Sequence, residues 1–343
     1  MPADFLLHLN MVLKERIIRF ATKFQDADLE QSFPLDYCIP VYHAVSDVEV
    51  AHLKHVIHYK KAKDFESDLD ELSRLFQFVT WDEFKDFHSG AFQPKKKIAL
   101  LTFDDGLSEF YFNAVPVLLR KGIYAVNFIN PKFVENNELM FRGKASVILE
   151  KIISANSINP EILKLLGISN SEEKTLKKQI LKIPFERQEL LDQIADLAEV
   201  DLEEYVKTQK PYMNLEQLKA LNLQGFGISN HGWDHPLYKD LPLSEQIENT
   251  QKGAEFLGEN QFLTDGFAFP FTDFGVGNSF FDQIFQHEYY CTFGSAGIKR
   301  DSVTKNFQRI PMENGKSASQ TLKEEVAYFN LKKMINRNQI VRR

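Results

Sequence analysis

The sequence predicts an α/β fold, in which a parallel sheet or barrel carries crossover helices and is interrupted by a helical insertion. The first observation is that apolar, strand-like runs alternate with helix-like runs both before and after the middle of the chain. The second is a central stretch rich in Leu, Lys and Glu with helical periodicity. We therefore expect an N-terminal helical segment at 1–36 and an α/β domain, built on a sheet or a barrel, at 37–343, with the insertion at about 135–222.

The elements follow from these patterns in chain order. Helical spacing of apolar residues predicts a leading helix at 4–24 and an amphipathic helix at 64–77, with a buried strand at 37–45 between them. A helix at 107–121 separates two predicted strands, 96–106 and 123–129. After the insertion, the remaining predicted elements are strands at 225–231, 265–271, 289–294 and 306–312 and a closing helix at 319–336. Because ligands collect at the carboxyl ends of parallel strands, the polar residues that follow these strands are candidates for one site.

Composition limits the function classes. The chain has 343 residues, 43% hydrophobic and 26% charged, which is typical of a soluble globular protein. The net charge of −7 gives no reason to expect a nucleic acid partner. The thirty Phe residues are interpreted as core packing rather than as an apolar cleft. Cys38 and Cys291 are interpreted as small core residues, and no disulfide framework is implied.

The two ends of the chain bear on location. The first residues do not resemble a signal peptide, and no apolar run is long enough for a membrane span. We therefore expect a cytoplasmic location. A basic cluster near the C-terminus is interpreted as a solvated flank, although weak contact with an anionic membrane surface stays open. The cluster comprises Lys332, Lys333, Arg337, Arg342 and Arg343.

The first motif that indicates chemistry is TFDDG at 102–106, where Asp104 and Asp105 follow an apolar strand. Two adjacent buried carboxylates are costly unless they have a use. A metal ion would bind one of them, and the other would remain free as a base. The alternative is an acidic turn ended by Gly106, since Asp-Gly turns are common.

The second motif is NHGWDHP at 230–236, where His231 and His235 are four residues apart. On a helical turn this spacing places both imidazoles on one side, where they can share one zinc-like ion. A chance HxxxH is the alternative. One Asp and two His make three protein ligands and leave open positions, which is the pattern of a catalytic metal site. Trp233 between the ligands would stack on a sugar ring or pack the turn.

Together the two motifs resemble the polysaccharide deacetylase family, also called the NodB-homology domain or carbohydrate esterase family 4. PVYHAVSD at 40–47 is similar to a tyrosine–histidine motif in one branch, which includes deacetylases of poly-N-acetylglucosamine. DGFAFPFTDFG at 265–275 looks like the third family motif. The resemblance covers roughly 37–134 and 223–312 and leaves the helical insertion outside.

The resemblance implies a distorted (β/α) barrel with fewer than eight strands. It implies a metal-dependent hydrolase that removes N-acetyl groups from an amino sugar in a polysaccharide or glycan precursor. Asp104 would be the general base, and Asp105, His231 and His235 would hold one divalent metal ion. That ion is usually Zn²⁺ in the family, with Co²⁺, Ni²⁺ or Fe²⁺ as alternatives.

Two departures from the family pattern affect these roles. The third motif normally contains an Arg and a Tyr, and both are absent from 268–272. Arg309 is a candidate replacement for that guanidinium, and the backbone N–H of Phe271 is a candidate oxyanion donor. The usual C-terminal catalytic His is also absent. In the branch with the tyrosine–histidine motif the N-terminal His takes its role, which makes His43 the candidate acid; a buried His bonded to backbone is the alternative.

Three other interpretations stay open. In the first, the chain is a catalytically inactive sugar-binding relative. In the second it is another mononuclear metallohydrolase, and in the third it is a scaffold whose helices bind a partner. His52, His55 and His58, spaced three apart, are expected to lie in a solvated or loosely ordered segment.

Overall fold

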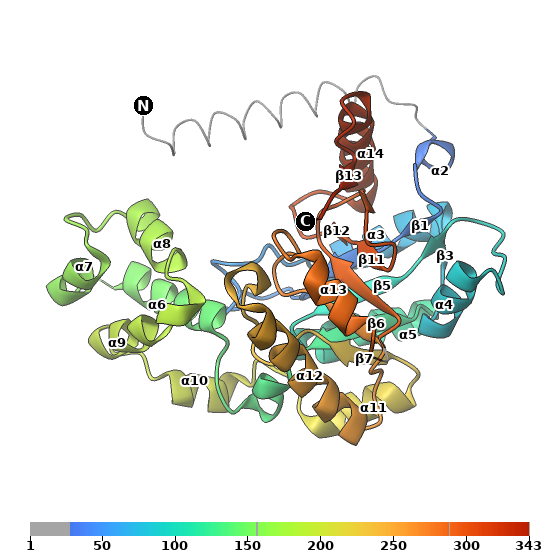
Figure 1. Cartoon of the computed structure of the whole chain (residues 1–343). Coiled ribbons are helices and arrows are strands. Elements are labelled where there is room, and N and C mark those ends of the chain that lie inside the picture. The colour runs from blue at the N-terminus through green and yellow to red at the C-terminus, as the bar shows by residue number, and fades with distance from the viewer. Residues whose placement is uncertain (1–27, 156, 288, 343) are drawn as a thin grey trace.

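A parallel sheet that curls into a nearly closed barrel forms the centre of the molecule (Figure 1). The computed structural model describes residues 28–155, 157–287 and 289–342, so the predicted leading helix at 4–24 lies outside the described residues. The barrel strands run in the spatial order β11-β9-β8-β7-β6-β5-β2-β12, and all paired neighbours are parallel. They are β2 (Pro40–Tyr42), β5 (Leu101–Asp104), β6 (Ala125–Ile129), β7 (Gly227–Asn230), β8 (Gly266–Ala268), β9 (Cys291–Gly294), β11 (Asn306–Gln308) and β12 (Ile310–Pro311).

One short segment closes the barrel. The edge strands β11 and β12 are consecutive in the chain and are separated only by Arg309. The Arg309 N–H donates to Gly294 O on one side at 3.0 Å, and the Ile310 N–H donates to Ile39 O on the other at 2.8 Å. The expectation of fewer than eight strands was wrong, because this closing segment pairs as two strands with opposite edges of the sheet.

Two small sheets contain the other strands of the described residues. One extends the amino ends of the barrel in the order β1-β4-β3, from β1 (Tyr37–Cys38), β4 (Ile98–Ala99) and β3 (Gln77–Phe78). The other pairs β10 (Arg300–Asp301) with β13 (Gln339–Ile340) near the C-terminus.

Aromatic side chains pack inside the barrel, on the amino side of the strand ends that carry the polar residues. Side chains alternate along β6, so Val126 and Phe128 face the interior while Ala125 and Ile129 face the outer helices. Phe293 packs on Phe128 with ring centroids 5.4 Å apart. The helix α4 (Trp81–Ser89) covers the amino end of the barrel, and its Trp81 and Phe84 side chains pack against the interior cluster. The interpretation of the Phe-rich composition as core packing therefore holds for the barrel interior.

Helices cover the outside of the barrel. Its α-helices outside the insertion are α2 (Leu29–Ser32), α3 (Ala62–Leu75), α4, α5 (Val115–Lys121), α11 (Leu215–Leu223), α12 (Leu243–Glu259), α13 (Asn278–Ile284) and α14 (Ala318–Met334). Shorter helical turns are a π-helix at Phe110–Ala114 and 3₁₀ turns at Pro131–Asn136, Phe185–Arg187 and Tyr238–Asp240. The helices α3, α5, α11 and α14 share one apolar cluster with the outward side chains of β5 and β6.

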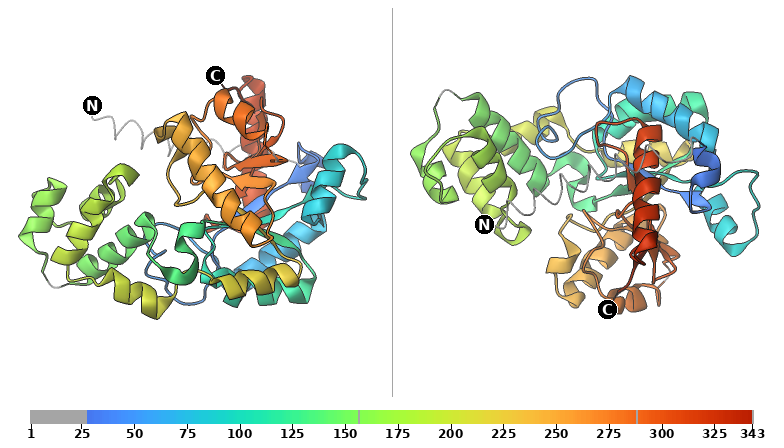
Figure 2. Two further views of the ribbon diagram at one scale, coloured as in Figure 1. Left: turned by 60° about the horizontal axis from the view of Figure 1, so that its bottom comes forward. Right: turned by 90° about the horizontal axis from the view of Figure 1, so that it is seen from above.

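The predicted insertion is helical and packs around its own core, to one side of the barrel (Figure 2). Its helices are α6 (Phe141–Ser154), α7 (Pro160–Leu166), α8 (Glu173–Leu181), α9 (Glu189–Leu197) and α10 (Leu202–Gln209). The following helix, α11, packs Leu218 and Leu221 into the barrel's cluster instead. The range predicted for the insertion, 135–222, thus ends inside a helix that covers the barrel.

The loop at 46–60, which follows β2 of the barrel, forms hydrogen bonds with the insertion. The Ser146 hydroxyl of α6 donates to Ala51 O at 2.6 Å, and His55 contacts Glu150 at 2.9 Å. His52 is 3% exposed and contacts the Tyr205 hydroxyl at 3.0 Å. The expectation that His52 and His55 lie in a solvated, loosely ordered segment was wrong, because both have partners in the insertion.

Two further features concern the ends of the chain. Within the described residues, no helix is both long and apolar enough to cross a membrane. Arg342 does not belong to a solvated basic flank as expected. Its side chain is buried and pairs with Asp273 and with Asp301 Oδ2, the latter at 2.6 Å.

Candidate active site

The predicted site residues meet at the carboxyl ends of the barrel strands. Asp104 ends β5 and Asp105 follows it, while His231 directly follows β7. His43 follows β2, and Arg309 lies in the closing segment between β11 and β12. These four strand ends, of β2, β5, β7 and β11, open at the same edge because the strands are parallel.

Asp104 is held by a buried arginine. The Arg309 guanidinium donates from Nη1 to Asp104 Oδ1 at 2.6 Å and from Nη2 to Oδ2 at 2.7 Å, a two-bond geometry that a planar guanidinium favours. Burial opposes the charged carboxylate, but Arg309, and to a lesser extent His231, outweigh it and lower the pKa of Asp104. Asp104 is therefore ionised at neutral pH, as a general base must be.

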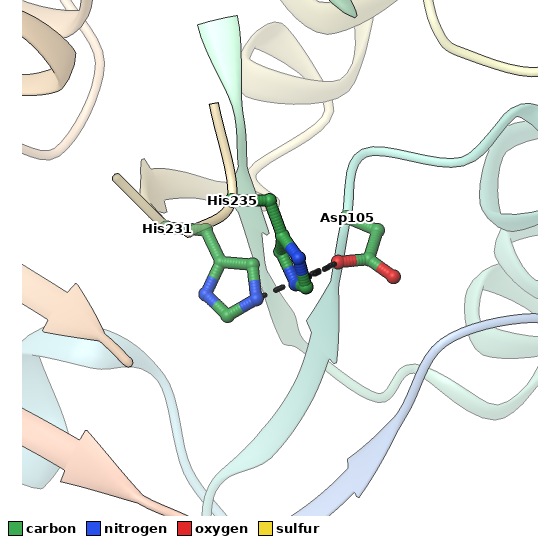
Figure 3. A group of neighbouring side chains, drawn as sticks. All are labelled: Asp105, His231 and His235. Carbon is green, nitrogen blue, oxygen red and sulfur yellow. Dashed lines mark ion pairs between the residues drawn. The ribbon is translucent and has the colours of Figure 1, made fainter. Parts of the chain in front are cut away.

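Asp105, His231 and His235 point toward one another in a buried cluster (Figure 3). Their candidate ligand atoms lie within 4.8 Å of one another. Asp105 Oδ1 is 3.2 Å from His235 Nε2 and 3.5 Å from His231 Nε2. Each side chain thus turns one donor atom toward a common point.

The loop that carries both histidines is fixed by hydrogen bonds. The His231 N–H donates to Ile129 O at 2.9 Å, and the Asn130 side-chain amide donates to His231 O at 2.6 Å. The expectation of a helical turn was wrong, because Gly232 and His235 have φ angles of 77° and 63°. Lys252 Nζ lies 4.1 Å from the centre of the Trp233 ring, so one face of that ring is covered.

The cluster fits a divalent metal ion. His231 Nδ1 lies 2.8 Å from Ala268 O, which places the proton on Nδ1 and leaves the Nε2 lone pair free for a metal. Burial lowers the pKa of His235 and favours its neutral, ligating form. Among the described residues, no well-oriented hydrogen bond reaches the buried Asp105 Oδ1, although both Nε2 atoms lie within 3.5 Å of it, and this is costly for a carboxylate unless a cation is nearby. One oxygen and two nitrogens suit Zn²⁺ and its neighbours in the transition series.

His43 has a carboxylate partner that the sequence interpretation missed. His43 Nδ1 lies 2.6 Å from Glu313 Oε2, and Glu313 Oε1 accepts the Ala44 N–H at 3.0 Å. Burial alone would lower the pKa of His43, but Glu313, with smaller contributions from Asp105 and Asp104, raises it to about 9. The partner is therefore a side chain, and not the backbone group considered as the alternative. The signal available in the sequence was an acid just after the last predicted strand, 306–312.

Phe271 lies in a strained turn at the third motif. Its φ is 57°, and the following Thr272 N–H donates back to Pro270 O at 2.6 Å. Among the described residues, no acceptor is found for the Phe271 N–H, so that donor is available. The Phe271 ring packs edge to face against the His235 ring, with ring centroids 4.4 Å apart.

Three of the nine described non-glycine residues with positive φ lie at this site. Asp105, His235 and Phe271 all have positive φ, at 73°, 63° and 57°. For residues other than glycine, each such conformation costs on the order of 1–3 kcal/mol and persists only where the surroundings enforce it. Three such residues around one cluster are typical of a functional site.

A cleft of about 500 Å³ opens onto these groups. The barrel contributes His43, Asp105, His235 and Phe271 to its wall. The opposite wall comes from the loop at 46–60 and from the insertion. A ligand held in this cleft would contact the candidate acid and two of the candidate metal ligands.

The fold and site define a parallel α/β barrel with one candidate mononuclear metal centre at its carboxyl end. Residues 92–180 match the family model described as polysaccharide deacetylase. That match includes Asp104 and Asp105, does not reach the histidines, and extends into the insertion that was expected to lie outside the resemblance. No curated protein matches this chain significantly in sequence.

Solved structures share the fold at low sequence identity. The deacetylase PplD from Streptococcus pyogenes, in complex with acetate, is 14% identical with a TM-score of 0.55, covering 84% of this chain and 97% of PplD. IcaB from Ammonifex degensii is 19% identical with a TM-score of 0.53 at the same coverages. A de-N-acetylase from Aggregatibacter actinomycetemcomitans is 13% identical with a TM-score of 0.51, covering 83% of this chain and 99% of that one. The predicted polysaccharide deacetylase resemblance and the (β/α) barrel are confirmed; the branch with the tyrosine–histidine motif stays a prediction.

Proposed function

We propose that this chain is a metal-dependent hydrolase that removes the N-acetyl group from an amino sugar in a polysaccharide or glycan precursor. The observation that carries the proposal is that a paired base, a paired acid and a three-residue ligand set meet at the carboxyl end of the barrel, beside a cleft that His43, Asp105 and His235 line. The Asp104–Arg309 pair and the His43–Glu313 pair flank the cluster of Asp105, His231 and His235.

Three residues have separate roles in the proposed reaction, as base, oxyanion donor and acid. Asp104, ionised and held by Arg309, accepts a proton from the attacking water. The Phe271 N–H donates a hydrogen bond to the oxygen that becomes negative as the carbonyl carbon is attacked. His43, kept protonated by Glu313, gives its proton to the departing nitrogen. Acetate and a free amino sugar result.

Asp105, His231 and His235 would hold the metal ion, which we propose to be Zn²⁺, with Co²⁺, Ni²⁺ or Fe²⁺ as alternatives. When bound, such an ion supplies a Lewis acid for the carbonyl and lowers the pKa of water. The cytoplasmic location and the weak membrane contact expected from the sequence stay predictions, and fractionation of tagged cells tests both.

Metal analysis and acetate release test the proposal together. We expect close to one transition-metal ion per chain in the native protein, and loss of that ion in Asp105→Ala and His231→Ala. The exposed His287 lies outside the cluster, so His287→Ala is the matched control and should keep the metal. Acetate release is then measured across N-acetylated sugars.

The outcomes separate the competing functions. Metal together with acetate release supports the deacetylase. Metal without acetate release from any amino sugar favours the inactive sugar-binding relative, or another mononuclear metallohydrolase if a different ester or amide is cleaved. Absence of metal after addition of zinc or cobalt overturns the proposed chemistry.

A further inference from the structure

The wall of the cleft opposite the candidate metal site contains one arginine, Arg142, that the proposed reaction does not use. It is the second residue of α6, the first helix of the insertion. Of the described residues that line this cleft, Arg142 is the only Lys or Arg. It therefore sets the charge of the wall that the insertion contributes.

The Arg142 guanidinium uses few of its donors within the protein. Nη1 donates to Leu181 O at 2.7 Å and to Ile183 O at 3.3 Å, and these bonds hold the end of α8 against α6. Among the residues that the structure describes, Nε and Nη2 donate to no acceptor, and no carboxylate forms an ion pair with this guanidinium. Arginine has five N–H donors in a planar fork, so an edge suited to a two-oxygen anion is left over.

The charge of Arg142 is not balanced locally. Its guanidinium carbon lies 4.5 Å from the centre of the Phe141 ring, and a ring face offsets only part of the cost of this half-buried positive charge. Burial lowers the pKa of Arg142, and no acid in the described part of the chain offsets that effect. The nearby lysines differ, because Lys144 pairs with Asp192 and Lys54 pairs with Glu150. The bonds to Leu181 O and Ile183 O therefore leave the charge of Arg142 without an anionic partner among the described residues.

Arg142 is close to the reacting groups. The guanidinium carbon is 5.9 Å from the centre of the Phe271 ring, which is 4.4 Å from the centre of the His235 ring. These two distances limit the separation between the guanidinium and His235 to about 10 Å. One or two pyranose rings span that distance, so a substituent on the reacting sugar or its neighbour can reach Arg142 while the acetamide lies at the candidate metal site.

We infer that the substrate carries an anionic group, a phosphate or a carboxylate, which the free edge of Arg142 binds across the cleft from the metal site. This inference rests on the proposed function and narrows its substrate to acidic N-acetylated glycans. Arg142 is then a specificity-determining residue of the insertion, which the barrel alone does not provide.

The test compares matched sugars on the metal-loaded full chain. Acetate release is measured with N-acetylglucosamine 6-phosphate, with N-acetylmuramic acid as the carboxylate arm, and with neutral N-acetylglucosamine. We expect kcat/KM to be roughly tenfold to hundredfold higher for at least one acidic sugar, as one charge-assisted contact allows. Arg142→Met should lower kcat/KM at least tenfold more for that sugar than for the neutral one, mainly through KM.

Controls separate charge recognition from folding. Lys151 is an exposed cation further along the same helix, so Lys151→Met should leave the preference unchanged. Arg142→Lys keeps the charge but loses the two-donor edge, and should fall between the native protein and Arg142→Met. Thermal unfolding of each variant identifies a loss of activity that comes from loosening α8.

Each result decides the inference. Equal kcat/KM for acidic and neutral sugars in the native protein would overturn it, as would an equal loss on all sugars in Arg142→Met. If no sugar releases acetate, the proposed function fails, and calorimetric binding of the same sugars decides the inference separately. Tighter binding of an acidic sugar by the native protein than by Arg142→Met supports it, and equal binding refutes it.

Discussion

Replacing Arg309 by methionine tests whether the closing segment of the barrel prepares the base. The side chains of Arg309 and Asp104 are 1% and 5% exposed, and two bonds of 2.6 and 2.7 Å join them. Removing one partner of such a buried pair leaves an uncompensated charge and costs about 3–5 kcal/mol of unfolding free energy. We expect Arg309→Met to be destabilised by an amount in that range.

Activity should fall further than stability alone would require. Asp104 loses both bonds that fix its orientation and the charge that keeps it ionised. Loss of a positioned base costs about 10²–10⁴ in rate, so kcat for acetate release should drop by a factor in that range. Arg309→Lys retains a positive charge but not the two-bond geometry, so its kcat should lie between those of the native protein and Arg309→Met.

Urea unfolding and steady-state acetate release measure the two effects. Arg120→Met is the matched control, because the Arg120 side chain is 58% exposed and should change neither quantity appreciably. In Asp104→Asn the carboxylate is gone, so adding Arg309→Met should cost less than it does in the native background. A native-like unfolding free energy and a kcat within threefold of native in Arg309→Met would refute the assigned role.

Three further predictions follow from the same contacts. A general acid works below its pKa, so activity that depends on His43 is lost as pH rises through about 9; Glu313→Gln should move this alkaline limb toward 6.5, measured as kcat/KM against pH. Asp104→Asn should retain the metal but lose about 10²–10⁴ in turnover, and near-native turnover would contradict its role as base. Arg342→Met should lower the unfolding free energy by about 3–5 kcal/mol, because it leaves a buried charge unpaired, whereas exposed Arg337→Met should change it by less than about 0.5 kcal/mol in urea unfolding.

Much of the barrel could be predicted because each strand has a local signal. Apolar runs at 96–106 and 123–129 contain β5 and β6, and the run at 306–312 contains β11 and β12. Whether the sheet stays open or closes depends on the partners of its edge strands, and periodicity does not determine these. The eighth strand was missed for that reason, since Arg309 divides one predicted strand between two edges.

Part of the site could also be predicted from local sequence signals. Asp105, His231 and His235 belong to short motifs with typical spacing, and the structure brings them together. The loop conformation was not readable, because a helical HxxxH and this loop have the same spacing. Glu313 and Arg142 carry no motif, and each acquires its candidate role only from a neighbour far away in the sequence.

Arg309 and Glu313 lie four residues apart on the segment that closes the barrel, and they serve opposite halves of the proposed reaction. Arg309 holds Asp104, the candidate base, and Glu313 holds His43, the candidate acid. The backbone of this segment bonds to Gly294 on one edge and to Ile39 on the other. If that closure is lost, the base and the acid lose their partners together, while the loop that carries His231 keeps its hydrogen bonds to Ile129 and Asn130. A substitution that weakens the closure should therefore abolish turnover before it abolishes metal binding.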